Sequence, residues 1–152
     1  MNKRPFYYIL LFIVVCVAIC SIPLHLPHPG NDTIRIFLGT NKGEAYYTVE
    51  PETEEFTRVC NGLEQLRYHF SPRAGIELTA PQTSDSPLLY AFLIYQTDNG
   101  KYSYLSVSER GFLSKDNQSY AIGHLGDDKA SKWLAELGQA LETVEPKSIE
   151  KI

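Results

Sequence analysis

The sequence is poor in the residues that two common classes of small protein require. It has three cysteines in 152 residues, which are too few for the disulfide framework of a small secreted scaffold. Basic residues are also in the minority, because 14 Lys and Arg stand against 18 Asp and Glu, for a formal net charge of -4. A chain without a basic excess lacks the electrostatic footprint of a nucleic-acid-binding protein. We therefore expect neither a disulfide scaffold nor a nucleic-acid partner.

Sequence motifs that carry known chemistry are missing as well. The chain has no His-Glu-x-x-His helix for zinc, no Gly-x-Ser-x-Gly elbow, no Gly-rich phosphate loop and no Cys-x-x-Cys pair. His25 and His28 lie in a Pro-rich stretch with no acid or thiol nearby in the sequence, so we expect no metal site there. The sequence thus predicts no catalytic residue, no cofactor and no metal.

What the chain does have is one long apolar run at its amino terminus. Lys3 and Arg4 precede the 18 residues 5–22 (PFYYILLFIVVCVAICSI), which include no charged residue and no Asn or Gln. As a helix that rises about 1.5 Å per residue, this run extends about 27 Å, close to the thickness of a hydrocarbon core. The next formally charged residue is Asp32, so positive charge flanks the run on its amino-terminal side. The pattern predicts a membrane segment with the rest of the chain outside the cell.

Three interpretations of this segment differ in what remains attached to the membrane. In the first it stays as an uncleaved single-pass anchor, and in the second it is a signal peptide with Ala18 and Cys20 before a cut at Ser21. In the third it is a lipoprotein signal, with Val17, Ala18 and Ile19 before a lipidated Cys20. We expect the anchor, because the run exceeds the core of about 7–15 residues in a typical signal peptide. A buried core helix this apolar on every side would need a larger protein around it.

A Pro-rich stretch separates the apolar run from the rest of the chain. Residues 23–30 (PLHLPHPG) cannot continue a helix, and we expect them to form an extended linker that spaces a domain from the membrane. From Asn31 onward, 12 Lys and Arg stand against 18 Asp and Glu, so this part carries a charge of −6. The predicted organisation is an anchor or signal segment at 1–22, the linker, an extracytoplasmic domain at 31–146 and a tail at 147–152.

Hydrophobic periodicity predicts a hairpin and then a helix at the start of the domain. Thr33–Leu38 puts Ile34, Ile36 and Leu38 on one side, and Glu44–Val49 is a second short strand after a turn cluster at residues 39–43. A helix period follows over Thr53–Leu66, with acidic residues in its first turn. Its apolar stripe, expected to be buried, comprises Phe56, Val59, Cys60, Leu63 and Leu66.

The remaining periodic segments complete the predicted fold. A second amphipathic helix begins at Asp127 or Asp128 and ends at Pro146, and its stripe comprises Ala130, Trp133, Leu134, Leu137, Leu141 and Val144. Short strands are expected at Arg67–Phe70, Gly75–Thr79, Phe112–Leu113 and Tyr120–Ile122. A loop is expected at Ala80–Pro87. The predicted class is α+β, an antiparallel or mixed sheet with two amphipathic helices on one face, preceded by one N-terminal transmembrane helix.

The strongest turn signal lies between two apolar runs in the middle of the domain. Leu88–Thr97 and Lys101–Ser108 flank Asn99 and Gly100, the preferred pair for a two-residue type I′ turn. A two-residue turn sets apolar residues of the two strands opposite one another. The side chains that it sends to the core are Phe92, Ile94, Leu105 and Val107.

The opposite face of this hairpin supplies the candidate binding residues. With the two-residue turn, Tyr95 lies opposite Tyr104, and Tyr102 lies nearby on the same face, whereas a three-residue loop would set Phe92 opposite Ser106. Tyrosine offers contact area and a hydrogen-bonding tip at little entropic cost, which suits recognition of a partner. We therefore predict that a protein or peptide partner contacts Tyr95, Tyr102 and Tyr104, although the same pattern also fits the ordinary solvated face of a sheet.

The layout resembles a known kind of protein. The chain has a basic start, one apolar span, a Pro-rich spacer and a single domain with the hairpin-rich run DNGKYSYLSVSERGFLSKDNQSYAIG. In this it looks like the small uncharacterised membrane-anchored or lipoprotein-type proteins of Gram-positive bacteria. The resemblance implies a location at the cell membrane and a protein class, and it implies no activity.

Two functions follow from these observations. The sequence favours a non-enzymatic binding or accessory module that is tethered to the cell membrane with its domain outside. Secretion or lipid anchoring after cleavage is the alternative location. The alternative function is a small extracytoplasmic hydrolase with a site near His69 or His124, since either histidine can serve as a base.

Overall fold

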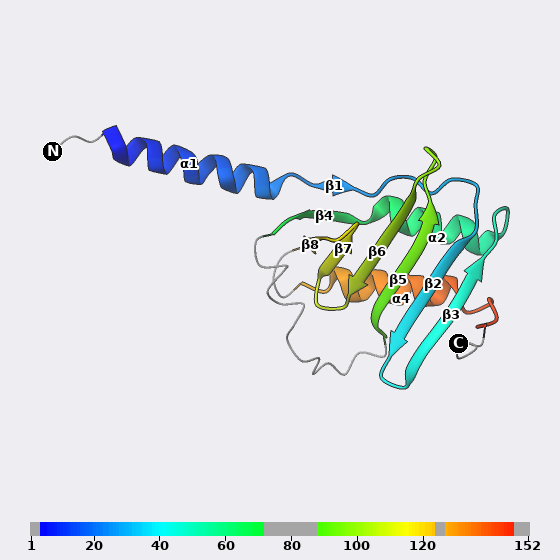
Figure 1. Cartoon of the computed structure of the whole chain (residues 1–152). Coiled ribbons are helices and arrows are strands. Elements are labelled where there is room, and N and C mark those ends of the chain that lie inside the picture. Colours follow the sequence, from blue (N-terminus) through cyan, green and yellow to red (C-terminus); the bar gives the residue numbers. More distant parts are fainter. Residues whose placement is uncertain (1–3, 72–87, 124–126, 148–152) are drawn as a thin grey trace.

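The structure is a computed structural model that describes residues 4–71, 88–123 and 127–147. In this part of the chain, an eight-stranded antiparallel sheet is accompanied by three helices. Figure 1 shows that two of the helices, α2 and α4, lie against one face of the sheet, while α1 extends away from it. The predicted α+β class, with two amphipathic helices on one face of an antiparallel sheet, is confirmed.

The strands form one sheet in the order β1-β4-β8-β7-β6-β5-β2-β3, and all neighbours are antiparallel. Their bounds are β1 Leu24–His25, β2 Ile34–Thr40, β3 Gly43–Val49, β4 Arg67–Phe70, β5 Leu88–Gln96, β6 Tyr102–Ser108, β7 Phe112–Lys115 and β8 Gln118–Ile122. The helices are α1 Arg4–Ser21, α2 Glu54–Gln65 and α4 Lys129–Ala140. The predicted strand at Gly75–Thr79 and the predicted loop at Ala80–Pro87 lie outside the described residues.

Helix α2 forms where the sequence predicted it. The Thr53 hydroxyl accepts a hydrogen bond from the Phe56 N–H at 3.1 Å and so caps the amino end of the helix. Two acids, Glu54 and Glu55, occupy the first turn, where the helix dipole favours negative charge. All five residues of the predicted stripe are buried, which confirms the helix phase.

Helix α4 packs beside α2 through the single tryptophan. Helix α4 ends at Ala140, before the predicted end at Pro146, so Leu141 and Val144 of the predicted stripe follow the helix. The stripe is buried except for Val144, which is partly buried and packs against the core. The Trp133 indole N–H donates a hydrogen bond of 2.8 Å to the Gly62 carbonyl of α2. This bond satisfies the polar end of a buried indole and ties the two helices together.

The predicted β2–β3 hairpin is confirmed, and the side chains of β2 alternate between the two faces of the sheet. Ile34 pairs with Val49, and Leu38 with Ala45. The even-numbered residues from Ile34 to Leu38 are buried under the helices, whereas Arg35 points to the other side and is exposed. The core therefore lies between the sheet and the pair α2 and α4.

The predicted register of the β5–β6 hairpin is wrong by one residue. Leu93 pairs with Leu105, and Tyr95 with Ser103, so the loop holds the three residues Asp98, Asn99 and Gly100. The Thr97 N–H donates to the Lys101 carbonyl at 2.8 Å and closes this loop. Gly100 has φ +74 while Asn99 has no positive φ, which is the pattern of a type I turn followed by a left-handed glycine rather than of a type I′ turn.

The one-residue difference reverses the predicted faces of β5. Ala91, Leu93 and Tyr95 point to the core and are fully buried, whereas Phe92 and Ile94 lie on the face away from the helices. Leu105 and Val107 of β6 are buried as predicted. The core side of the hairpin was thus predicted correctly for β6 and wrongly for β5.

A type I′ turn does occur, in the β7–β8 hairpin. Lys115 pairs with Gln118, so Asp116 and Asn117 form a two-residue loop, and both have positive φ, at 49 and 66. The predicted pairing of the segments around Phe112 and Tyr120 is confirmed by β7 and β8. Asn and Asp tolerate this backbone conformation better than other non-glycine residues.

The predicted linker packs on the domain instead of standing free. We name residues 24–30 the strap. Leu26 and Pro29 of the strap are buried. The Tyr68 hydroxyl donates to the His25 carbonyl at 3.3 Å, and the Gly30 N–H donates to the Gln96 carbonyl at 2.7 Å. The strap therefore forms an edge of the sheet and crosses the end of the β5–β6 hairpin, so it does not act as a spacer.

Helix α1 is apolar on all sides and exposed. Its large apolar side chains, from Phe6 to Ile19, are 46% to 71% exposed. Nowhere in the ranges 4–71, 88–123 and 127–147 is a helix both long and apolar enough to cross a membrane. The predicted helix is confirmed, whereas its transmembrane role is not.

The hairpin geometry predicts unequal effects for two neighbouring substitutions. Gly100→Ala is expected to lower the free energy of unfolding by about 1–2 kcal/mol, because alanine is strained at positive φ. Asn99→Ala is expected to stay within about 0.5 kcal/mol, as at an ordinary exposed position. Urea unfolding followed by Trp133 fluorescence measures both. Equal losses at the two positions would favour the type I′ turn instead.

Because Cys60 is buried, we expect its thiol to react slowly with maleimide. Burial first, and then the nearby charges of Glu64 and Asp98, raise the pKa of Cys60 from 9.0 to about 11. In a Cys16→Ser/Cys20→Ser variant, maleimide labelling at pH 8 should be slow in the native protein and fast in denaturant. The folded state keeps its proton longer than the unfolded state, so stability is full below pH 9 and declines as pH rises toward 11. Rapid native labelling would contradict the buried position.

Candidate functional site

The helices leave the other face of the sheet, away from α2 and α4, uncovered (Figure 1). We name it the open face. Strand pairing arranges its side chains in rows that cross the sheet. One row runs through Tyr46, Phe37, Phe92 and Ser106, and the next through Thr48, Arg35, Ile94 and Tyr104. The open face is therefore built by strands β3, β2, β5 and β6.

Aromatic rings form the centre of the open face. The ring centroid of Phe37 lies 4.7 Å from that of Tyr46 and 5.9 Å from that of Phe92, and both pairs are tilted. All three side chains are half-buried by one another. Contacts of this kind stabilise the sheet and also leave an apolar, aromatic surface toward solvent.

Tyr90 lies in the neighbouring row of the open face, opposite Gly39 of β2. Its ring lies over Gly39, where a Cβ would fall 2.1 Å from a ring carbon, so only glycine fits beneath it. Its hydroxyl donates a hydrogen bond to the Glu44 carboxylate, and this bond raises the pKa of Tyr90 to about 12. Tyr90 is thereby held across three strands of the open face.

The three predicted partner-binding tyrosines do not share one face. Tyr102 and Tyr104 lie on the open face and are 59% and 50% exposed, whereas Tyr95 is 0% exposed in the core. Burial raises the pKa of Tyr95 to about 12, and its hydroxyl donates to the Pro27 carbonyl of the strap at 3.4 Å. Tyr95 is thus a core residue that contacts the strap, and we no longer count it among the candidate binding residues.

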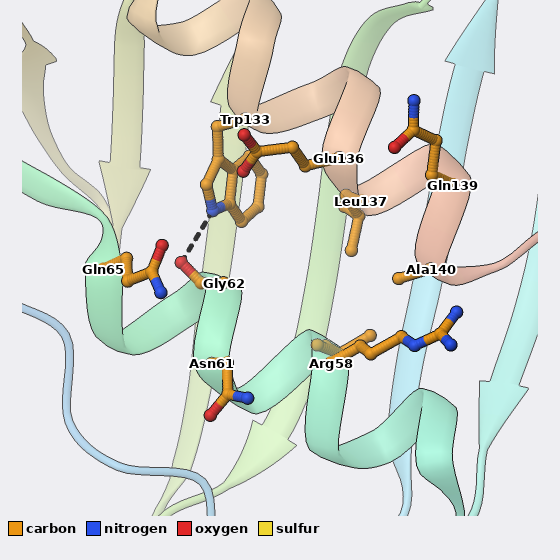
Figure 2. Close-up of a pocket in the computed structure, with 10 residues that line it drawn as sticks. Arg58, Asn61, Gly62, Gln65, Trp133, Glu136, Leu137, Gln139 and Ala140 are labelled. Atoms are coloured by element: carbon orange, nitrogen blue, oxygen red, sulfur yellow. Dashed lines mark hydrogen bonds between the residues drawn. The ribbon is translucent and has the colours of Figure 1, made fainter.

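A groove of about 370 Å³ separates the outer sides of the two helices. Figure 2 shows Trp133 reaching from α4 to the Gly62 carbonyl of α2, with polar side chains around it. The polar lining comprises Arg58, Asn61, Gln65, Glu136 and Gln139. Amide and charged side chains of this kind are ordinary on the outer sides of two packed surface helices. They indicate no specific ligand or reaction for this groove.

A hollow of about 460 Å³ lies where α1 meets the domain, and His69 is part of its lining together with Ser21 and Glu136. The Ser21 hydroxyl donates to the Val17 carbonyl at 2.8 Å, so it is used within α1. His124, the other residue of the predicted hydrolase alternative, lies outside the described residues.

The remaining predicted positions are accounted for by local contacts. His28 Nε2 lies 2.7 Å from Glu64 Oε1, and its Nδ1 lies 3.5 Å from Asp98 Oδ2, so His28 fastens the strap to α2 and to the hairpin loop. Among residues 4–71, 88–123 and 127–147, no group of three or more His, Cys, Asp or Glu is placed to hold a metal ion. Cys20, the predicted lipidation residue, is partly buried near the carboxyl end of α1.

The sequence reasoning missed most of the open face. Phe37, Tyr46 and Phe92 meet only through the pairing of β2 with β3 and β5, which the sequence did not predict for β5. The alternation of Arg35 and Phe37 with the buried isoleucines of β2 was a signal in the sequence that could have placed these two residues on the open face. Comparisons with protein-family models, curated proteins and solved structures gave no match.

The placement of the tyrosines predicts opposite outcomes for two variants. Tyr95→Ala is expected to destabilise the fold by about 3–5 kcal/mol, as for other large buried aromatic residues. The double variant Tyr102→Ala/Tyr104→Ala is expected to lose no more than about 1 kcal/mol, because exposed cross-strand pairs contribute little. Urea unfolding measures both. A severe loss in the double variant would mean that the open face is covered.

Proposed function

We propose that this protein is a non-enzymatic binding module that α1 tethers to the cell membrane, with the domain outside and the open face contacting a protein or peptide partner. One observation carries the proposal: a domain with a complete core bears an apolar helix whose side chains are exposed on all sides. Exposed apolar surface costs about 25 cal/mol per Å² in water. A bilayer is the environment that removes this cost for a helix without a polar face.

The distribution of charge supports insertion with the domain outside. Lys3 and Arg4 precede the apolar residues, and no formally charged residue follows until Asp32, which is the bias of a segment with its amino terminus in the cytoplasm. The helix is short for a span, and a bilayer accommodates a short segment by local thinning and by basic side chains that reach up to the interface.

The composition of the open face supports a protein or peptide partner. Aromatic residues and arginine are enriched at the centres of protein interfaces, where lysine and acidic residues are depleted. Phe37, Tyr46, Phe92 and Arg35 occupy the central rows of the open face, and Tyr102 and Tyr104 flank them. The domain's charge of −6 from residue 31 onward argues for a partner that is not itself strongly acidic.

Membrane extraction tests the tether. The full chain, expressed in bacteria, should resist alkaline washing of membranes at its intact mass of 17.2 kDa. Protease added to protoplasts should digest its domain. Ile13→Lys/Val14→Lys should release it, because each charge at a helix centre costs about 2.5–3.5 kcal/mol on insertion. Glu54→Lys, on the domain, is the matched control. Retention of the Lys variant, or a product cut before Ser21 or lipidated at Cys20, would refute the anchor.

Site-specific crosslinking tests the open face. A photoreactive residue at position 104 should capture a neighbour in the native membrane, and one at position 139, on the helix side, should not. Tyr102→Ala/Tyr104→Ala should weaken that association by about 2 kcal/mol or more if these rings are hot spots. Equal capture from positions 104 and 139 would exclude the open face as the specific contact.

A further inference from the structure

One end of the open face is hollowed, beside the exposed ring of Tyr102. The hollow has a volume of about 300 Å³, and Arg35, Thr48, Ile94, Asp32, Glu50 and Lys147 contribute to its lining. We name it the Arg35 hollow. Arg35 stands directly between Thr48 of β3 and Ile94 of β5 in the pairing of the strands. The backbone that holds it is therefore bonded on both sides.

The Arg35 guanidinium is unpaired in the part of the chain that the structure describes. Two acids line the same hollow, yet both are engaged by Thr33. The Thr33 backbone N–H donates to Asp32 Oδ1 at 2.7 Å, and its hydroxyl donates to Glu50 Oε2 at 2.8 Å. Arg35 therefore presents five N–H donors in a fixed planar fork to solvent.

Two further residues of the Arg35 hollow, Thr48 and Lys147, offer polar groups to a ligand. The Thr48 hydroxyl is buried, and among the described residues no atom hydrogen-bonds to it. Lys147 adds a second cation, and its backbone N–H donates to the Tyr46 carbonyl at 2.8 Å, which fixes the chain beside β3. A buried hydroxyl without a partner is costly, and rotation of the Thr48 side chain toward the hollow would let a ligand oxygen satisfy it.

We propose that the Arg35 hollow binds one carboxylate of the partner, an Asp or Glu side chain, and this inference rests on the proposed function. Arg35 pairs with the carboxylate through two parallel N–H···O bonds. The Thr48 hydroxyl donates a third bond, Lys147 adds positive charge, and Ile94 and the Tyr102 ring contact the methylene groups.

The planar fork of Arg35, and not the net charge of the hollow, selects a carboxylate. Asp32 and Glu50 offset the charges of Arg35 and Lys147, so the hollow has no net positive charge to hold a dianionic phosphate. The acidic domain repels a long acidic segment for the same reason. The partner therefore presents one carboxylate within a surface that is otherwise neutral or basic.

An NMR titration of the full chain in detergent micelles tests this site with benzoate as the probe. Benzoate should shift the Arg35 Nε–Hε signal and the backbone amides of Thr48 and Ile94 in a saturable way. Benzamide and benzylamine, which keep the ring and lack the carboxylate, should not. Arg35→Gln should weaken benzoate binding at least about tenfold, and Arg35→Lys should not restore it, since lysine lacks the planar fork.

Matched variants keep the outcome interpretable. Arg58→Gln, on α2 and on the opposite side of the sheet, should leave benzoate binding unchanged. Thr48→Val should weaken it several-fold without lowering the melting temperature, because the swap removes the unpartnered hydroxyl and keeps the shape. Benzoate shifts that persist in Arg35→Gln would overturn the site. Tighter benzoate binding after deletion of residues 148–152 would make the chain's own tail the occupant and overturn the partner assignment.

Failure of this inference is separable from failure of the proposed function. Crosslinking from position 104 that is unchanged by Arg35→Gln, together with no benzoate binding, would overturn the carboxylate site and leave the open-face module standing. Benzoate binding at Arg35 together with equal capture from positions 104 and 139 would support the site and refute the protein-binding module.

Discussion

The register of the β5–β6 hairpin decides which side of the sheet each central residue occupies. Side chains alternate along a strand, so a shift of one residue exchanges the two faces completely. The loop of Asp98, Asn99 and Gly100, with its left-handed glycine, sets Leu93 opposite Leu105. The aliphatic core under α2 and α4, the burial of Tyr95 and the aromatic open face all depend on this one turn.

Sequence patterns predicted the elements that have one apolar face. The stripes of α2 and α4 and the alternation in β2 each leave a single buried side, so periodicity alone fixed their orientation. β5 is different, because Ala91, Leu93, Phe92 and Ile94 make both of its faces apolar. Against such a strand the turn statistics decide the register, and the statistics of Asn-Gly favoured the wrong loop.

Only the part of the candidate site that lies within a single strand could be predicted from the sequence. Tyr102 and Tyr104 follow from alternation within β6 and lie on the open face as expected. Arg35 and Phe37 join them only because β2 pairs with β5, two strands that are far apart in the sequence. Local patterns predict which side of its own strand a residue occupies, and they carry no information about which strand lies next to it.

The strap changes the mechanical relation between α1 and the domain. The Tyr68 and Tyr95 hydroxyls bond to its carbonyls from within the core, and His28 fastens it to Glu64. A flexible tether would let the domain rotate freely about the end of α1. The docked strap instead leaves only Ile22 and Pro23 between the end of α1 and the sheet edge at β1, which restricts that rotation. If α1 lies in a bilayer, as we propose, the open face is then held close to the lipid surface, and a partner in the same membrane would meet it from a restricted direction.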